Sequence, residues 1–162
     1  MKGVVAFDSF HGSTKTVAEA IAEQLKALGH DVQLINLRES VPTGTSGDFL
    51  LVGSPTRGGK PSKETTTFVD GLDASWKGKP IGVFDTLGPL SKDAAKRKQT
   101  IENISTSWGK NAASRLAEQC GGKGLNVVAT GHFPVTGMWG PLAPEGPEMA
   151  KEFARKFAAN LK

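Results

Sequence analysis

Five short apolar runs constrain this 162-residue chain most, because the segments between them are too long for hairpins. Strands joined by long crossovers lie parallel in one sheet, with helices packed on both faces. The sequence therefore predicts an α/β fold, a three-layer sandwich formed as a single domain over residues 1–162. The expected strands are Lys2–Asp8, Asp31–Asn36, Asp48–Gly53, Ile81–Thr86 and Leu125–Thr130.

Helical spacing of apolar residues separates these runs. Val17, Ile21, Leu25 and Leu28 repeat at intervals of three and four residues and predict a helix over about Ser13–Leu28. Further helices are expected from near Ser62 through Leu72, from Gly109 to Cys120 and from Pro147 to Leu161. A loop is expected over Leu37–Gly47, and Ser91–Thr106 is a polar segment with no assigned helix.

Several classes of protein are excluded early. No run approaches the ~18 consecutive apolar residues of a membrane helix, and the first residues lack the apolar core of a secretory signal. We therefore expect no membrane span and a cytoplasmic location. The one cysteine, Cys120, has no disulfide partner in the chain, and three scattered histidines lack metal-ligand spacing, so no metal site is expected.

The net charge of +4 is concentrated in the middle of the chain. Residues 57–98 carry nine basic and five acidic side chains, whereas residues 1–56 carry four and six. No basic run is interleaved with aromatic residues as in a groove for single-stranded nucleic acid. An acidic partner or an anionic ligand is therefore expected, and nucleic acid is not.

The loops that leave the carboxyl ends of parallel strands meet at one sheet edge, where ligands bind. The first of them, Ser9–Thr14, combines hydroxyls, an imidazole and a glycine at the start of a predicted helix. Amides at a helix N-terminus and nearby hydroxyls suit a phosphate monoester. Ordinary capping by Ser13 or Thr14 explains the same residues without a ligand. The other edge loops are Ser54–Pro61, Leu87–Ser91 and Gly131–Pro144.

Other phosphate and hydrolase motifs fail on spacing. The first loop has only Gly12 and lacks the G-x-G-x-x-G of a dinucleotide site. In the second loop Lys60 falls one place late for a P-loop, and Pro61 separates it from the next serine. Gly53-Ser54 occupies the strand end where a receiver domain has its aspartate, and G-x-S-x-G is absent.

Three segments closely resemble the flavodoxin family: VVAFDSFHGSTKTVAEAIAEQL, DFLLVGSPTRGGKPSKETTTFV and IGVFDTLGP. The first loop is similar to the family's (S/T)-x-T-G-x-T: Ser9, Gly12 and Thr14 match, and His11 replaces the central threonine. The resemblance implies a flavodoxin-like five-stranded parallel sheet of order 2-1-3-4-5 with FMN at its carboxyl edge.

The same resemblance implies where the cofactor lies. The FMN phosphate is expected at Ser9, His11, Gly12, Ser13 and Thr14, and the isoalloxazine ring is expected beside Pro55, Thr56, Arg57, Gly58, Gly59, Thr86, Leu87 and Gly88. Family members often place aromatic side chains against the ring, whereas this chain has no tyrosine.

Three features near the expected ring leave alternatives open. Arg57 can stack on the ring, reach the phosphate or remain an exposed surface arginine. The Gly58-Gly59 peptide can turn a carbonyl toward flavin N5, or the two glycines can simply permit a turn. Trp139 covers the flavin, plugs the loop or contacts a partner.

Four further residues with reactive side chains are not counted among the predicted site residues. His132 has no partner visible in the sequence, and Asp8 and Asp85 are expected to end their strands, where they cap turns or act as acids or bases. Cys120 is expected to pack at a helix end, without redox chemistry.

The resemblance implies an FMN-dependent electron-transfer protein that shuttles electrons one at a time between redox partners. The excess of basic side chains in residues 57–98 favours acidic partners. Two alternatives remain at this point: an NAD(P)H-dependent FMN/quinone reductase, and a flavodoxin-like binding or regulatory module without redox activity.

Overall fold

The computed structural model describes residues 1–106 and 111–161, and within them a five-stranded sheet has the order β2-β1-β3-β4-β5. Every neighbouring pair of strands is parallel, which confirms the predicted fold class and strand order. The strands are β1 (Lys2–Phe7), β2 (Asp31–Asn36), β3 (Phe49–Pro55), β4 (Pro80–Leu87) and β5 (Asn126–Pro134).

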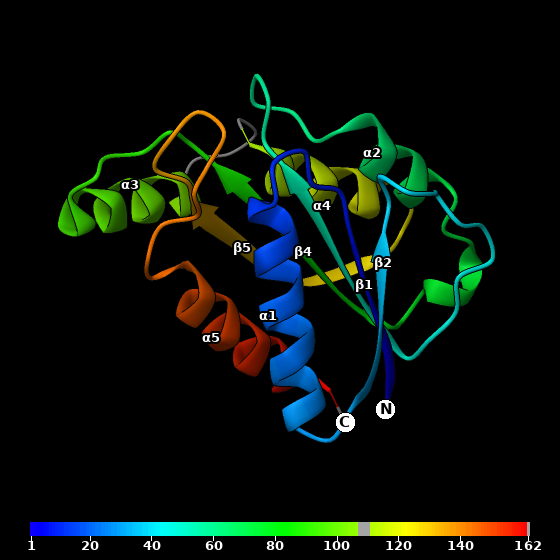
Figure 1. Ribbon diagram of the computed structural model, residues 1–162. Coiled ribbons are helices and arrows are strands. Elements are labelled where there is room, and N and C mark those ends of the chain that lie inside the picture. Colours follow the sequence, from blue (N-terminus) through cyan, green and yellow to red (C-terminus); the bar gives the residue numbers. More distant parts are fainter. Residues whose placement is uncertain (107–110, 162) are drawn as a thin grey trace.

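Helices cover both faces of this sheet (Figure 1). One face packs against α1 (Ser13–Ala27) and α5 (Gly146–Ala158). The other packs against α2 (Lys63–Asp70), the 3-10 helix η1 (Ala74–Trp76) and α4 (Ala112–Gly122). A further helix, α3 (Ala94–Thr106), stands at the β5 side of the sheet.

Strand alternation divides the apolar residues between two cores. In β1, Val5 and Phe7 face the α1/α5 core, whereas Val4 and Ala6 face the α2/α4 core. All four side chains are buried, as expected for a parallel strand covered on both faces. The loops at the carboxyl edge of the sheet therefore extend from strands that are packed on both faces.

A glycine on β3 permits close aromatic packing near that edge. A Cβ atom at Gly53 would lie 2.1 Å from Cε2 of Phe84 on the neighbouring strand. The Phe84 ring therefore fills the space above the Gly53 backbone, and any larger residue at position 53 would displace it.

The helix α3 was not predicted, because its sequence is polar and lacks an apolar stripe. Asp93 Oδ1 accepts hydrogen bonds from the amides of Ala95 and Lys96 at its start. Buried Arg97 donates to both carboxylate oxygens of Glu145, at 2.8 and 2.7 Å. These hydrogen bonds lower the pKa of Glu145 and fix α3 to the start of α5.

Several element boundaries differ from the prediction, by one to four residues. The strand expected to end at Thr130 continues to Pro134, because its last four residues pair with residues 84–87 of β4. The helix expected from Gly109 begins at Ala112, after an Asn111 cap whose Oδ1 accepts from the Ser114 amide, and residues 107–110 lie outside the described part. In the described chain, no helix combines the length and apolar character needed to cross a membrane.

Candidate functional site

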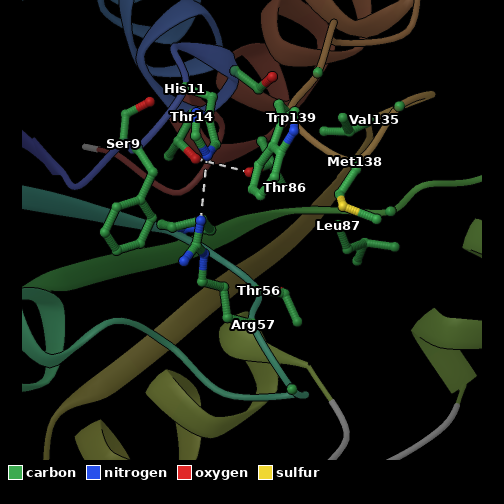
Figure 2. Close-up of a pocket in the computed structure, with 17 residues that line it drawn as sticks. Ser9, His11, Thr14, Thr56, Arg57, Thr86, Leu87, Val135, Met138 and Trp139 are labelled. Atoms are coloured by element: carbon green, nitrogen blue, oxygen red, sulfur yellow. Dashed lines mark hydrogen bonds between the residues drawn. The ribbon is translucent and has the colours of Figure 1, made fainter.

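A cavity of about 320 Å³ opens at the carboxyl edge of the sheet, between the loops that follow β1, β3, β4 and β5 (Figure 2). Every predicted site residue except Gly12 and Gly59 lines it. The residues shared by the prediction and the cavity wall are Ser9, His11, Ser13, Thr14, Pro55, Thr56, Arg57, Gly58, Thr86, Leu87 and Gly88. The wall also includes Phe10, Val135, Gly137, Met138, Trp139 and Gly140.

The loop of residues 9–14 presents the start of α1 to the cavity. Gly12 precedes the helix with a φ of 96°, a left-handed conformation that favours glycine. Its amide donates to Ser9 Oγ at 3.0 Å, so Gly12 shapes the loop although it does not line the cavity. In the described chain no side chain caps the first turn of α1, whereas Ser62 caps α2. The first amides of α1 therefore remain available to an anion.

A buried hydrogen bond joins this loop to β4. Thr14 Oγ1 and Thr86 Oγ1 are 2.7 Å apart, and both side chains line the cavity. This hydrogen bond holds the start of α1 against the end of β4. It therefore fixes the loop expected to hold the phosphate relative to a strand end expected to border the ring.

The loop after β3 forms a tight turn around Gly58 and Gly59. Arg57 and Lys60 exchange two backbone hydrogen bonds of 3.0 Å, and the two glycines have φ angles of 58° and 75°. Two consecutive positive φ angles are typical of a type I′ turn. The Gly59 carbonyl accepts from Arg115 Nε at 2.7 Å on α4, which holds it away from the cavity.

Arg57 lies across the loop of residues 9–14 (Figure 2). Its guanidinium carbon is 4.1 Å from the centre of the Phe10 ring, and its Nη2 is 3.3 Å from His11 Nε2. The His11 ring in turn lies 4.7 Å from the Trp139 ring, at an interplanar angle of 58°. His11 therefore contacts residues from two other loops at the cavity.

The loop after β5, residues 135–145, closes another side of the cavity. Ala143 donates its amide to the Pro134 carbonyl at 2.8 Å, which folds the loop back on the strand end. Its tip exposes 74% of Met138 and 61% of Trp139. The sequence placed this loop at the ligand edge and singled out Trp139, but it gave no role to Met138 or to Phe10.

Asp8 directly follows β1, and its carboxylate is fully buried. Arg38 donates from Nε to Asp8 Oδ1 at 2.9 Å and from Nη2 to Oδ2 at 2.7 Å, and also bonds Glu64. The hydrogen bonds to Asp8 raise the pKa of Arg38, with Glu64 acting in the same direction and burial opposing them. Asp8 does not line the cavity, and its carboxylate forms an ion pair with Arg38. This role differs from both roles considered from the sequence, the cap of a turn and an acid or base.

Asp85 lies behind the cavity wall. It is the partner of His132, a histidine for which the sequence alone indicated no partner. Asp85 Oδ1 is 2.9 Å from His132 Nδ1, and its Oδ2 accepts from the Ala113 amide at 3.0 Å and from Thr56 Oγ1 at 3.2 Å. Thr56 lines the cavity, so this buried network supports the wall from behind. Only tertiary structure brings Asp85 and His132 together, since they are 47 residues apart.

Cys120 and metal-binding groups add no chemistry to the site. Cys120 is buried in α4, and burial raises the pKa of its thiol to about 11, with Lys123 acting in the opposite direction. In residues 1–106 and 111–161, no three His, Cys, Asp or Glu side chains are grouped so as to hold a metal ion.

Comparisons with known proteins agree with this architecture. A family model described as a flavodoxin domain matches residues 4–130. The crystal structure of oxidised flavodoxin 1 from Bacillus cereus superposes with a TM-score of 0.73 at 24% identity, over 100% of both chains. Rubredoxin oxygen:oxidoreductase from Desulfovibrio gigas superposes with a TM-score of 0.63 at 20% identity, over 99% of this chain and 37% of that one. Both structural likenesses are likenesses of fold.

A curated relative is similar over a shorter stretch. An uncharacterized protein of Methanocaldococcus jannaschii is 29% identical over 109 residues, or 64% of this chain. The match spans 28% of the length of that relative.

Proposed function

The chain belongs to the flavodoxin domain family, and from this premise we propose that it binds FMN in the cavity and carries electrons one at a time between redox proteins. The observation that carries the proposal is the uncapped start of α1, which faces the cavity beside hydroxyl side chains. Amides and hydroxyls suit a phosphate monoester without a metal ion.

The wall of the cavity fits the two ends of FMN. Ser9, Ser13 and Thr14 supply hydroxyls on the phosphate side. Leu87 and Trp139 supply apolar surface on the side expected to hold the ring.

FMN, when bound, supplies the electron-transfer chemistry, and the chain positions and shields it. The hydrogen bond between Thr14 and Thr86 keeps the phosphate side and the ring side at a fixed separation. The Gly58-Gly59 turn offers backbone groups at the ring side, where left-handed residues without side chains allow a close approach. Trp139, on the loop of residues 135–145, is placed to exclude water from the cavity.

The proposed partners are acidic redox proteins. The net charge of residues 57–98 is +4, and this segment includes two of the loops at the cavity. Met138 and Trp139 are exposed at the cavity rim, where apolar contact can hold a partner after charge has guided its approach.

Absorbance of the protein purified without added flavin tests the proposal. Flavin bands in the visible spectrum, and one FMN released per chain on denaturation, are the expected result. Apoprotein that binds neither FMN nor riboflavin would contradict it. Steady oxidation of NADPH by the purified protein, with a quinone and without an added reductase, would instead indicate a reductase.

A further inference from the structure

Two guanidinium groups lie over the same ring at the cavity entrance, but only one of them is neutralised. Arg38 and Arg57 have their guanidinium carbons 4.2 and 4.1 Å from the centre of the Phe10 ring. Arg38 is paired with Asp8 and Glu64. Among the residues that the structure describes, no carboxylate lies within ion-pair distance of Arg57. The charge of Arg57 is thus available to a ligand.

The contact between Arg57 and His11 indicates which nitrogen donates and which accepts. An arginine remains protonated in proteins and has no acceptor atom. At the 3.3 Å contact, Arg57 Nη2 therefore donates and His11 Nε2 accepts. An imidazole that accepts at Nε2 is neutral and carries its proton on Nδ1. In this state Arg57 contributes an uncompensated positive charge to the cavity wall.

We infer that Arg57 and His11 form a cationic clamp for the FMN phosphate, an inference that rests on the proposed function. The phosphate replaces His11 Nε2 as the acceptor for Arg57, and the freed Nε2 takes one proton from solvent and donates it as a hydrogen bond to the phosphate. The N–H bond forms as the bond to that proton breaks in the hydronium ion or protonated buffer that supplies it, and no other covalent bond changes.

Charge balance favours this exchange. A phosphate monoester carries close to two negative charges above neutral pH, and the clamp supplies one positive charge from Arg57 and one from protonated His11. The nearby carboxylates, Asp8 and Glu64, are both held by Arg38 and do not compete for the clamp. Trp139, the other neighbour of His11, carries no charge. A threonine at position 11, as in the family pattern, would supply only a neutral hydroxyl.

Calorimetric titration at pH 7.5 tests the clamp, with Tris and Hepes buffers of equal ionic strength, because their different ionisation enthalpies reveal proton uptake. The phosphate of FMN is then almost fully dianionic, so an uptake belongs to the protein. Wild-type apoprotein should take up protons with FMN and none with riboflavin. His11→Gln should abolish the uptake, since glutamine cannot be protonated.

Affinity measured by flavin fluorescence quenching gives the second readout. Arg57→Gln should weaken FMN binding about tenfold and leave riboflavin binding unchanged. Tenfold is near the lower end of the range for losing a hydrogen bond to a charged group, and we expect it because the arginine is exposed. Lys60→Gln is the matched control, because it removes the same charge from the same turn and its side chain does not line the cavity. It should weaken FMN binding less than twofold.

The outcomes separate the clamp from the proposed function. If FMN binds and its proton uptake persists in His11→Gln, or if Arg57→Gln and Lys60→Gln weaken it equally, the clamp is wrong and FMN binding stands. If neither FMN nor riboflavin binds the wild-type apoprotein, the proposed function fails and the clamp fails with it. Unfolding curves of each variant confirm that the fold is retained.

Discussion

The Oγ1 atoms of Thr14 and Thr86 lie 2.7 Å apart, and they join the first turn of α1 to the end of β4. Both side chains are buried, yet both line the cavity. The site is thus built around a hydrogen bond between two elements that are 72 residues apart. Its strength can be measured without any ligand.

Thr14→Val should lower the free energy of unfolding of the apoprotein by about 1–3 kcal/mol, because it leaves the Thr86 hydroxyl buried without its partner. Thr14→Val combined with Thr86→Val should lose less than the sum of the two single changes, since neither hydroxyl then remains unpaired. Urea unfolding of the four proteins gives the coupling. Strict additivity would show that the two hydroxyls do not stabilise each other.

Gly58→Ala should destabilise the protein by about 1–2 kcal/mol, the penalty for an L-residue in a left-handed conformation. A Cβ at Gly58 would meet no atom within 4 Å, so the penalty is conformational and not steric. Gly121→Ala is the control: it also has open space, but it lies within α4 and should stabilise by about 0.5–1 kcal/mol. Thermal unfolding distinguishes the two, and equal effects would mean that the Gly58 turn relaxes freely.

Cys120 should react slowly with iodoacetamide in the native protein. Because burial raises the pKa of the thiol to about 11, the protonated and unreactive form dominates at pH 8. The native rate should rise about tenfold per pH unit until pH nears that pKa, as long as the fold persists. In urea, the exposed thiol should react rapidly at pH 8. Rapid native alkylation at pH 8 would show that α4 opens locally.

His132→Leu should lower the free energy of unfolding by about 1–3 kcal/mol, since it leaves one oxygen of buried Asp85 without its donor. His132→Asn offers an amide donor near the position of Nδ1 and should recover part of that loss. Urea unfolding at pH 7 compares the two variants. A leucine variant at least as stable as the asparagine variant would indicate that packing alone matters at this position.

Electron transfer to an acidic redox partner should slow as ionic strength rises, because salt screens the attraction to residues 57–98. Lys92→Glu with Lys96→Glu should slow the bimolecular rate severalfold at low salt and flatten its salt dependence. Lys26→Glu is the control, since Lys26 lies in the last turn of α1, away from the cavity. Stopped-flow rates over a salt series measure both effects, and a rate that increases with salt would argue for basic partners.

Much of the fold could be predicted because the strands carry their own signal. The apolar run within Asp48–Gly53 is typical of a strand buried on both faces of a parallel sheet, and the helical period of α1 begins directly after a loop rich in hydroxyl side chains. The helix α3 carried no such signal. Its ion pair between Arg97 and Glu145 spans 48 residues, and no local pattern encodes it.

The candidate site was predictable to the extent that single loops determine it. Residues near strand ends, such as Ser9 and Thr56, could be placed at the sheet edge from strand direction alone. The contacts that cross between loops could not. Arg57 remained open between three roles until the fold placed it against His11 and Phe10, and the pairing of His132 with Asp85 depends on the register of β5 against β4.

The sheet also separates the cavity from both ends of the chain. β1 begins and α5 ends at the edge opposite the cavity (Figure 1). A linker or affinity tag attached at either end can therefore fix the molecule to an electrode with its cavity turned toward the solution. Because the two ends lie on the same side of the molecule in Figure 1, attachment through either one leaves the same opening accessible to dissolved molecules.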